Sequence, residues 1–242
     1  MSRYIKRLVE AADEGGLRAV RSLVERGADV NGPDEKRRTA LVCASAKGHI
    51  DVVRYLIDNG ADASVEGARD DMFGIATGTA LCGASAKGHS DVVEALVGNG
   101  ADVNQVDSWG WTALLDACLN GHDDVVRLLV DNGADVNVGN DGGITPLMLA
   151  SENDRNDIVV FLIHHGANVH AKDDEGRTAL DYARDDGDVS EILTNGAVIL
   201  NAALEELVSF VHEHKHGMSD DVYVKMNAFL QRLWRGTARQ ST

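Results

Sequence analysis

The chain has 242 residues and a formal net charge of −16, with 23 Lys and Arg against 39 Asp and Glu. So acidic a surface lacks the basic stripe that displaces counterions from nucleic acid or holds a protein to anionic lipid, which excludes general nucleic-acid and membrane-surface binding. Only 2 prolines and 5% aromatic residues exclude a proline-rich chain and favour repeated small helices over a β-sandwich.

Three short strings recur along the chain in a fixed order. An Asn-Gly-Ala-Asp string or a close relative contains Gly27, Gly60, Gly100, Gly133 and Gly166, at gaps of 33, 40, 33 and 33 residues. A Thr-Ala-Leu or Thr-Pro-Leu string begins at Thr39, Thr79, Thr112, Thr145 and Thr178. A Gly-His pair follows three of these threonines, at Gly48, Gly88 and Gly121. Self-similarity at a fixed period is the signature of a repeat architecture.

Each repeat predicts two helices and a turn. The Thr is expected to cap a first helix with its hydroxyl, and the Gly-His pair to hold the turn that follows. A carboxylate such as Asp51 then begins a second helix, where it complements the helix dipole. Apolar runs such as 52–57 have the spacing of a buried helix, and the Asn-Gly pair ends it with Gly in the left-handed conformation. The next polar turn contains an Asn that tolerates left-handed backbone.

Six units follow from this register, at residues 3–31, 32–64, 65–104, 105–137, 138–170 and 171–196. The first lacks the Thr string and begins with a helix, as a terminal capping unit does. The third carries seven extra residues before Thr79, and the sixth is three residues short and degenerate. Residues 1–196 are therefore one repeat domain. Apolar faces within 197–235 predict a helical pair that caps the last unit, followed by a polar tail to residue 242.

Together, Thr-Ala/Pro-Leu-x-x-Ala, Gly-His-x-Asp-Val-Val and Asn-Gly-Ala-Asp-Val-Asn at a 33-residue period resemble ankyrin repeats over most of the chain. The resemblance implies an all-α solenoid of helix-turn-helix units joined by β-turn or hairpin loops. It also implies a non-catalytic module that binds another protein. The family's His after Thr-Pro-Leu is replaced here by Val42, Cys82, Leu115, Met148 and Asp181.

No phosphate loop, dinucleotide fingerprint or nucleophile elbow is present, so we expect no cofactor and no catalysis. Cys43, Cys82 and Cys118 fall inside first helices and are interpreted as small buried apolar residues. Three cysteines do not make a disulfide framework. The charged N-terminal residues lack the apolar core of a signal peptide, and no apolar run is long enough to span a membrane. We therefore expect a cytoplasmic protein, with the nucleus as the alternative.

Two further groups carry competing interpretations. His212 and His216 are spaced i, i+4, as metal ligands often are, but Gly217 follows at once and a solvated helix end is the favoured interpretation. Asn31, Asn104 and Asn137 close the Asp-Val-Asn strings and suit a turn. The resemblance also permits hydroxylation of such asparagines.

The ankyrin resemblance places partner contacts on the turn tips and on the exposed side of each first helix. By register from each Thr, the predicted partner-binding residues are Lys36, Arg38, Lys47, Ile75, Lys87, Trp109, Trp111, Leu119, Asn120, Asp141, Ile144, Glu152, Asp174, Glu175, Arg177, Asp185 and Asp186. Trp109 and Trp111 flank Gly110 at a turn tip, where polar residues are the rule. Exposed Trp is enriched in binding hot spots, although one ring folding back onto a neighbouring unit is the alternative. The insertion within 65–77 is either an enlarged finger for a partner or a disordered segment.

Four functional hypotheses remain. The first is an adaptor, complex subunit or inhibitor that is monomeric when free and binds another protein. The second is an acidic regulator that masks a basic segment of its partner, because the net charge falls from +1 over residues 1–64 to −8 over residues 138–196. The third is a metal or enzymatic role for the C-terminal histidines. The fourth is a purely structural solenoid, against which the unequal repeats and the Trp pair argue.

Overall fold

The computed structural model describes residues 2–67, 78–184 and 188–196. These residues form twelve α-helices and a closing π-helical turn, without a β-strand. The chain divides into two compact units, Met1–Pro146 and Leu147–Thr242, which are considered separately. No helix in the described part of the chain is long and apolar enough to cross a membrane.

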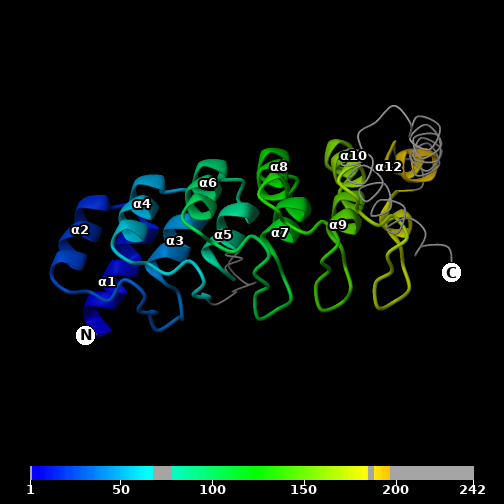
Figure 1. The fold of residues 1–242 in the computed structure, drawn as a ribbon. Coiled ribbons are helices and arrows are strands. Elements are labelled where there is room, and N and C mark those ends of the chain that lie inside the picture. Colours follow the sequence, from blue (N-terminus) through cyan, green and yellow to red (C-terminus); the bar gives the residue numbers. More distant parts are fainter. Residues whose placement is uncertain (1, 68–77, 185–187, 197–242) are drawn as a thin grey trace, which may run out of the picture. The chain divides into compact units, whose positions relative to one another are not determined.

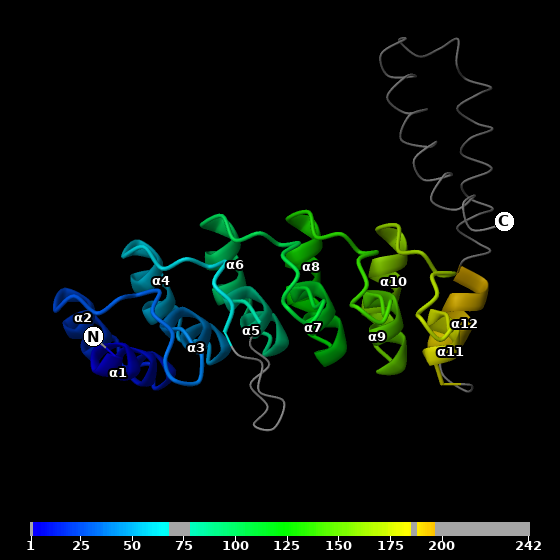
Figure 2. The ribbon, with the colours of Figure 1, turned by 90° about the horizontal axis from the view of Figure 1, so that it is seen from below.

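The first unit holds four antiparallel helix pairs (Figure 1). Their bounds are α1 (Ser2–Asp13), α2 (Leu17–Glu25), α3 (Ala40–Ala46), α4 (Ile50–Asp58), α5 (Ala80–Ala86), α6 (Ser90–Gly98), α7 (Ala113–Asn120) and α8 (Asp123–Asp131). The first helices α1, α3, α5 and α7 pack on one another in one row, and α2, α4, α6 and α8 form a second row (Figure 2). Long loops leave the pairs on one side (Figure 1).

The first helices α3 and α5 are short and rich in small residues, and neighbouring helices enclose them. Every residue of α3 and of α5 is buried. A methyl group on Gly83 of α5 would already lie 3.3 Å from Cβ of Ala46 in α3, so the helices approach closely. The predicted Thr caps are confirmed: the hydroxyls of Thr39, Thr79 and Thr112 accept from the backbone N–H three residues on, at 3.2, 3.1 and 3.3 Å.

The second helices are amphipathic, as predicted. In α4 the buried residues are Val52, Val53 and Leu56, while Asp51 stands exposed in the first turn. The glycine after each of the first five second helices is left-handed, with φ of +84° at Gly60. This φ is strained for any side chain, which is why Gly stands at this position in the first five units.

The Gly-His pairs connect neighbouring units, a relationship that the predicted turn role did not include. The Nε2 atom of His49 lies 3.0 Å from the carbonyl oxygen of Asp13, and that of His122 lies 3.1 Å from the carbonyl oxygen of Ala86. Asp13 and Ala86 are the last residues of α1 and α5, the first helices of the preceding units. The His ring therefore satisfies one of the carbonyls that a helix C-terminus leaves without a partner.

The second unit contains α9 (Pro146–Glu152), α10 (Asn156–His164), α11 (Ala179–Tyr182), α12 (Asp188–Glu191) and the π-helical turn η1 (Ile192–Gly196). The helices α11 and α12 have only four residues each. At Thr178 the cap takes the form of a capping box, and the Thr178 hydroxyl also donates to the carboxylate of Asp181, 2.7 Å away. Asp181 also accepts from the Thr178 backbone N–H at 2.6 Å.

Three predictions lie outside the described residues. These are the enlarged finger or disordered segment, of which residues 68–77 are not described, the helical pair within 197–235, and the metal hypothesis at His212 and His216.

Candidate functional site

The loops between repeats end in tight turns that we call fingers, at residues 34–38, 107–111, 140–144 and 173–177. One Asp or Asn side chain organises each of them. In the second finger, Oδ1 of Asp107 accepts from the backbone N–H groups of Trp109 and Trp111 at 2.9 and 2.8 Å. The Asp107 N–H donates to the carbonyl of Trp111 at 2.8 Å and closes the loop. The first residues of the other fingers, Asp34, Asn140 and Asp173, accept the same pair of backbone donors.

These organising residues are not among the residues predicted from the sequence. The available signal was the recurrence of Asp107, Asn140 and Asp173 at the 33-residue period. Because a side-chain oxygen that accepts two backbone donors mimics a backbone turn, the finger tips are ordered before any partner arrives.

The structure separates the two tryptophans of the second finger. The Trp109 side chain stands 55% exposed at the tip, whereas Trp111 is half-buried in the stem. Gly110 between them has a φ of +74°, and a methyl group there would collide with Asp141 of the next finger. The tip is thus held from its own side by Asp107 and from the neighbouring side by close contact with the 140–144 finger.

The predicted basic residues differ in exposure and in their surroundings. Lys36, Lys47 and Lys87 are exposed, and the last two are the C-cap residues that follow α3 and α5. Arg38 instead binds Oδ2 of Asp34 through Nε and Nη2, at 3.0 and 2.8 Å. Burial on its own raises the pKa of Asp34, but the hydrogen bonds from Arg38 and the Lys36 backbone outweigh it and lower that pKa. Arg38 therefore stabilises its own finger.

The predicted residues between the basic and acidic ends are mixed in exposure. Leu119 and Ile144 are half-buried, while Asn120 and Asp141 are exposed. Asn120 donates its side-chain amide to the carbonyl of Asp116, 2.8 Å away in the same helix. Ile75 lies outside the described residues.

In the second unit, the acidic finger is built around a buried carboxylate. Oδ2 of Asp173 accepts from Nε of Arg177 at 2.8 Å and from the hydroxyl of Tyr182 at 2.7 Å, and the guanidinium lies 4.8 Å from the centre of the Tyr182 ring. Burial opposes the charged form, but the hydrogen bonds from Tyr182 and Arg177 dominate and hold the pKa of Asp173 at about 2. Burial, together with the bond to Asp173, raises the pKa of the Tyr182 phenol to about 12. Arg177 also binds Glu175 at 3.0 Å.

The remaining acidic candidates are solvent-facing where they are described. Glu152, Asp174 and Glu175 are exposed, whereas Asp185 and Asp186 lie outside the described residues. The predicted cations Arg38 and Arg177 thus form ion pairs within their own fingers. The carboxylates of Glu152, Asp174 and Glu175 remain exposed on the surface of the second unit.

The cysteines are buried free thiols, which confirms their predicted packing role. Burial raises the pKa of Cys43 and of Cys82 to about 12 and raises that of Cys118 as well. At neutral pH these groups are protonated, and a protonated thiol is a poor nucleophile. Over residues 2–67, 78–184 and 188–196, no three His, Cys, Asp or Glu side chains come together as a metal site requires.

The Asp-Val-Asn asparagines do not adopt the left-handed backbone expected of them. Among the described non-glycine residues, φ is positive only at Arg37 and Asp154. Asn31 instead reaches the next repeat, where its Nδ2 donates to the carbonyl of Gly60 at 3.0 Å and its Oδ1 accepts from the Asp62 N–H at 2.7 Å. We call this pair of bonds the carboxamide clamp.

A family model described as ankyrin repeats (3 copies) matches residues 7–67, 81–173 and 137–203. The chain belongs to the ankyrin-repeat family. The family assignment and the all-α helical class predicted from the sequence are thereby confirmed. Ankyrin repeats are generally protein–protein interaction modules and are typically non-enzymatic. No curated protein matches the chain.

Proposed function

We propose that this ankyrin-repeat protein binds a protein partner through its fingers and first helices, with Trp109 as the central anchor. The observation that carries the proposal is a large aromatic ring, 55% exposed, on a finger tip fixed by Asp107. Binding energy concentrates in a few aromatic or Arg residues that fill pockets on a partner. A tip that is already ordered loses little conformational entropy when it binds.

The surroundings of Trp109 support this role. Val106, at the start of the same loop, is 47% exposed and extends the apolar surface. Trp111 is half-buried at the last position of the finger, and we propose that it supports the finger tip without contacting the partner. Arg38 and Arg177 each form an ion pair with the Asp of their own finger. We propose that they stabilise these fingers and do not contact the partner directly.

The direct test uses the full chain as bait in extract from the source cell, beside the Trp109→Ala and Val160→Ala variants, since Val160 is an exposed apolar residue on the second helix α10. The affinity of each captured protein is then measured with purified components. We expect a partner that binds the wild type and Val160→Ala with similar affinity and Trp109→Ala much more weakly. Equal affinity for all three baits would remove Trp109 as the anchor and with it this proposal.

A second candidate function rests on charge. Residues 138–196 hold 12 Asp and Glu against 4 Lys and Arg. Of these, Arg177 is engaged by Asp173, while Asp174 and Glu152 face solvent. We propose, as the alternative mode of action, that this acidic surface masks a basic segment of the partner, since opposite potentials steer association. Binding that is insensitive to salt would contradict this mode and leave the Trp109 proposal standing.

A further inference from the structure

One junction of the first unit departs from the repeat in two neighbouring residues. Where other repeats have Asp-Val-Asn, the chain has Asp62-Ala63-Ser64. The backbone is nevertheless the same: the Ser64 N–H donates to Oδ1 of Asp62 at 2.8 Å, and the Asn104 N–H donates to Oδ1 of Asp102 at 2.9 Å. Only the side chains that fill the junction have become smaller.

The consequence is a missing carboxamide clamp. At the neighbouring junction, Asn104 donates to the carbonyl of Gly133 at 3.0 Å and accepts from the Asp135 N–H at 2.8 Å. The equivalent groups beside Ser64 are the carbonyl of Gly100 and the N–H of Asp102. The Ser64 hydroxyl is too short to reach them and donates back to Asp62 at 2.6 Å. Within the described residues, no side chain bonds this carbonyl and N–H.

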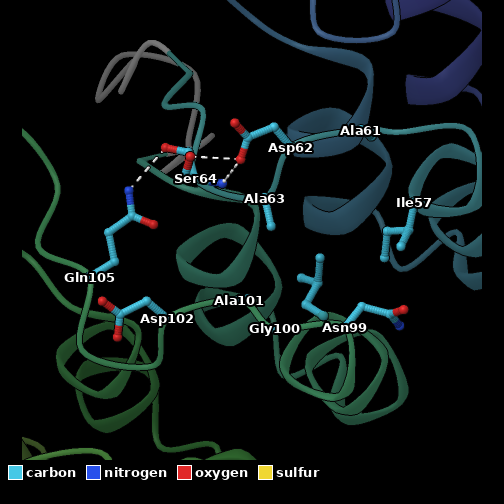
Figure 3. A pocket seen from close by; sticks show the side chains of 11 residues that line it. Ile57, Ala61, Asp62, Ala63, Ser64, Asn99, Gly100, Ala101, Asp102 and Gln105 are labelled. Carbon is cyan, nitrogen blue, oxygen red and sulfur yellow. Dashed lines mark hydrogen bonds between the residues drawn. The ribbon is translucent and has the colours of Figure 1, made fainter.

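A pocket of about 260 Å³ lies in the space that the two truncations leave (Figure 3). Ile57 of α4 and Leu96 of α6 supply apolar walls, and the backbone of 99–102 forms one rim. Gln105 braces the opposite rim, because its Nε2 donates to the carbonyl of Ser64 at 2.9 Å. Pockets for whole small ligands hold about 300–1,000 Å³, so this one suits a side chain of a protein better than a complete cofactor.

The polar groups of the pocket select the chemistry of that side chain. A group that replaces the clamp must donate to the Gly100 carbonyl and accept from the Asp102 N–H at the same time. An ammonium or guanidinium cannot accept, and a carboxylate cannot donate and is repelled by Asp62 and Asp102. A carboxamide does both, as Asn31 and Asn104 show at their own junctions.

We propose that this pocket receives the carboxamide of an asparagine side chain from the protein partner, which completes the clamp that Ser64 leaves open. The inference rests on the proposed function only in that a protein partner carries the asparagine. The pocket itself can be tested without any partner.

The test follows backbone amide NMR signals of the full chain during titration with N-acetyl-L-asparagine N-methylamide. We expect a saturable shift of the Asp102 signal, with a dissociation constant in the millimolar range or weaker because one side chain buries little surface. The matched probes N-acetyl-L-leucine and N-acetyl-L-aspartate N-methylamide should leave the signal in place. Ser64→Asn, which supplies the carboxamide from within the chain, should abolish the shift.

A reciprocal variant guards against a trivial loss of binding. Val103→Ala combined with Asn104→Ser should open an equivalent site and produce a new probe-dependent shift at Asp135. Trp109→Ala, which changes a residue that does not line the pocket, should bind the probe as the wild type does. The proposal is overturned if Asp102 does not respond to the asparagine probe, responds equally to the leucine probe, or still responds in Ser64→Asn. Such a result would leave partner binding through Trp109 untouched.

Discussion

The imidazole ring of His122 lies directly against Gly88 of the preceding repeat. A methyl group on Gly88 would stand 2.5 Å from Nδ1 of that ring, and Gly88 has a φ of +73°. Glycine is therefore required twice at this position, once for its backbone conformation and once for the approach of the next repeat. The same arrangement joins Gly15 to His49 and Gly48 to His89.

The first prediction separates these two requirements. Gly88→Ala should lower the free energy of unfolding by more than the roughly 1–2 kcal/mol that left-handed backbone alone costs an alanine, because the His122 ring must also move. Gly60→Ala is the matched control, since φ there is +84° and nothing lies within 4 Å of the added methyl. Urea unfolding of both variants gives the comparison. Equal losses would mean that the His122 contact is unimportant.

The second prediction concerns the clamp. Asn104→Ser removes two hydrogen bonds, each worth about 1 kcal/mol net, and should lower the melting temperature. Ser64→Asn adds the same two bonds at a junction with matching backbone and should raise it. Differential scanning calorimetry of the two variants provides the measurement. A lower melting temperature for Ser64→Asn would show that the junctions differ in more than their side chains.

The third prediction concerns acid stability of the 173–177 finger. The pKa of Asp173 is lowered from 3.8 to about 2, so its contribution is complete above pH 3.8 and is lost as the pH falls through about 2. Carboxyl carbon NMR should find the Asp173 midpoint near 2. Tyr182→Phe removes one hydrogen bond and should raise that midpoint toward 3.8. An unchanged midpoint in Tyr182→Phe would exclude the phenol as a cause.

The fourth prediction concerns steering by the acidic surface. Asp174→Asn combined with Glu175→Gln should lower the association rate with a basic partner more than it raises the dissociation rate, because rim charges act on the encounter. The effect should shrink as salt shortens the screening length to about 8 Å at physiological ionic strength. The charge-matched control is Asp58→Asn with Glu94→Gln, both exposed on second helices. Stopped-flow or biosensor kinetics would measure both variants, and equal rate losses would indicate a general effect of net charge.

The fifth prediction distinguishes the two tryptophans. Trp109→Ala should cost about 2–4 kcal/mol of binding, or roughly 30- to 1,000-fold in affinity, with little change in melting temperature. Trp111→Ala should lower the melting temperature, because its half-buried ring packs in the stem of the finger. Paired measurements of affinity and melting temperature decide the matter. A Trp109→Ala variant that unfolds several degrees early yet keeps its affinity would make that ring a structural element.

Local chemistry explains why the sequence predicted so much of the fold. A Thr cap such as Thr112 acts on a backbone group three residues away, and a glycine such as Gly133 acts through its own φ. The helices, their ends and the burial of Cys118 could therefore be predicted from single repeats. The spacing of apolar residues in each second helix likewise predicts which face of that helix is buried and which is exposed.

The parts that could not be predicted depend on residues in other repeats. Asn31 bonds to Gly60 and Asp62, and His122 bonds to Ala86, so their partners lie 29 to 36 residues away. Only the packed array brings such groups together. Which of Trp109 and Trp111 is exposed also escaped prediction, because the burial of each side chain depends on its surroundings in the folded protein.

The unclamped junction at Ser64 has a consequence for how the array unfolds. In a linear repeat protein, cooperativity is transmitted from each helix pair to its neighbour through their shared interface. An interface with two fewer hydrogen bonds and a pocket in place of a Val side chain transmits it more weakly. We therefore expect α1–α4 and α5–α8 to open as two semi-independent blocks. Hydrogen exchange should begin at this boundary, so the place that accepts a foreign asparagine is also the place where occupancy would most strengthen the array.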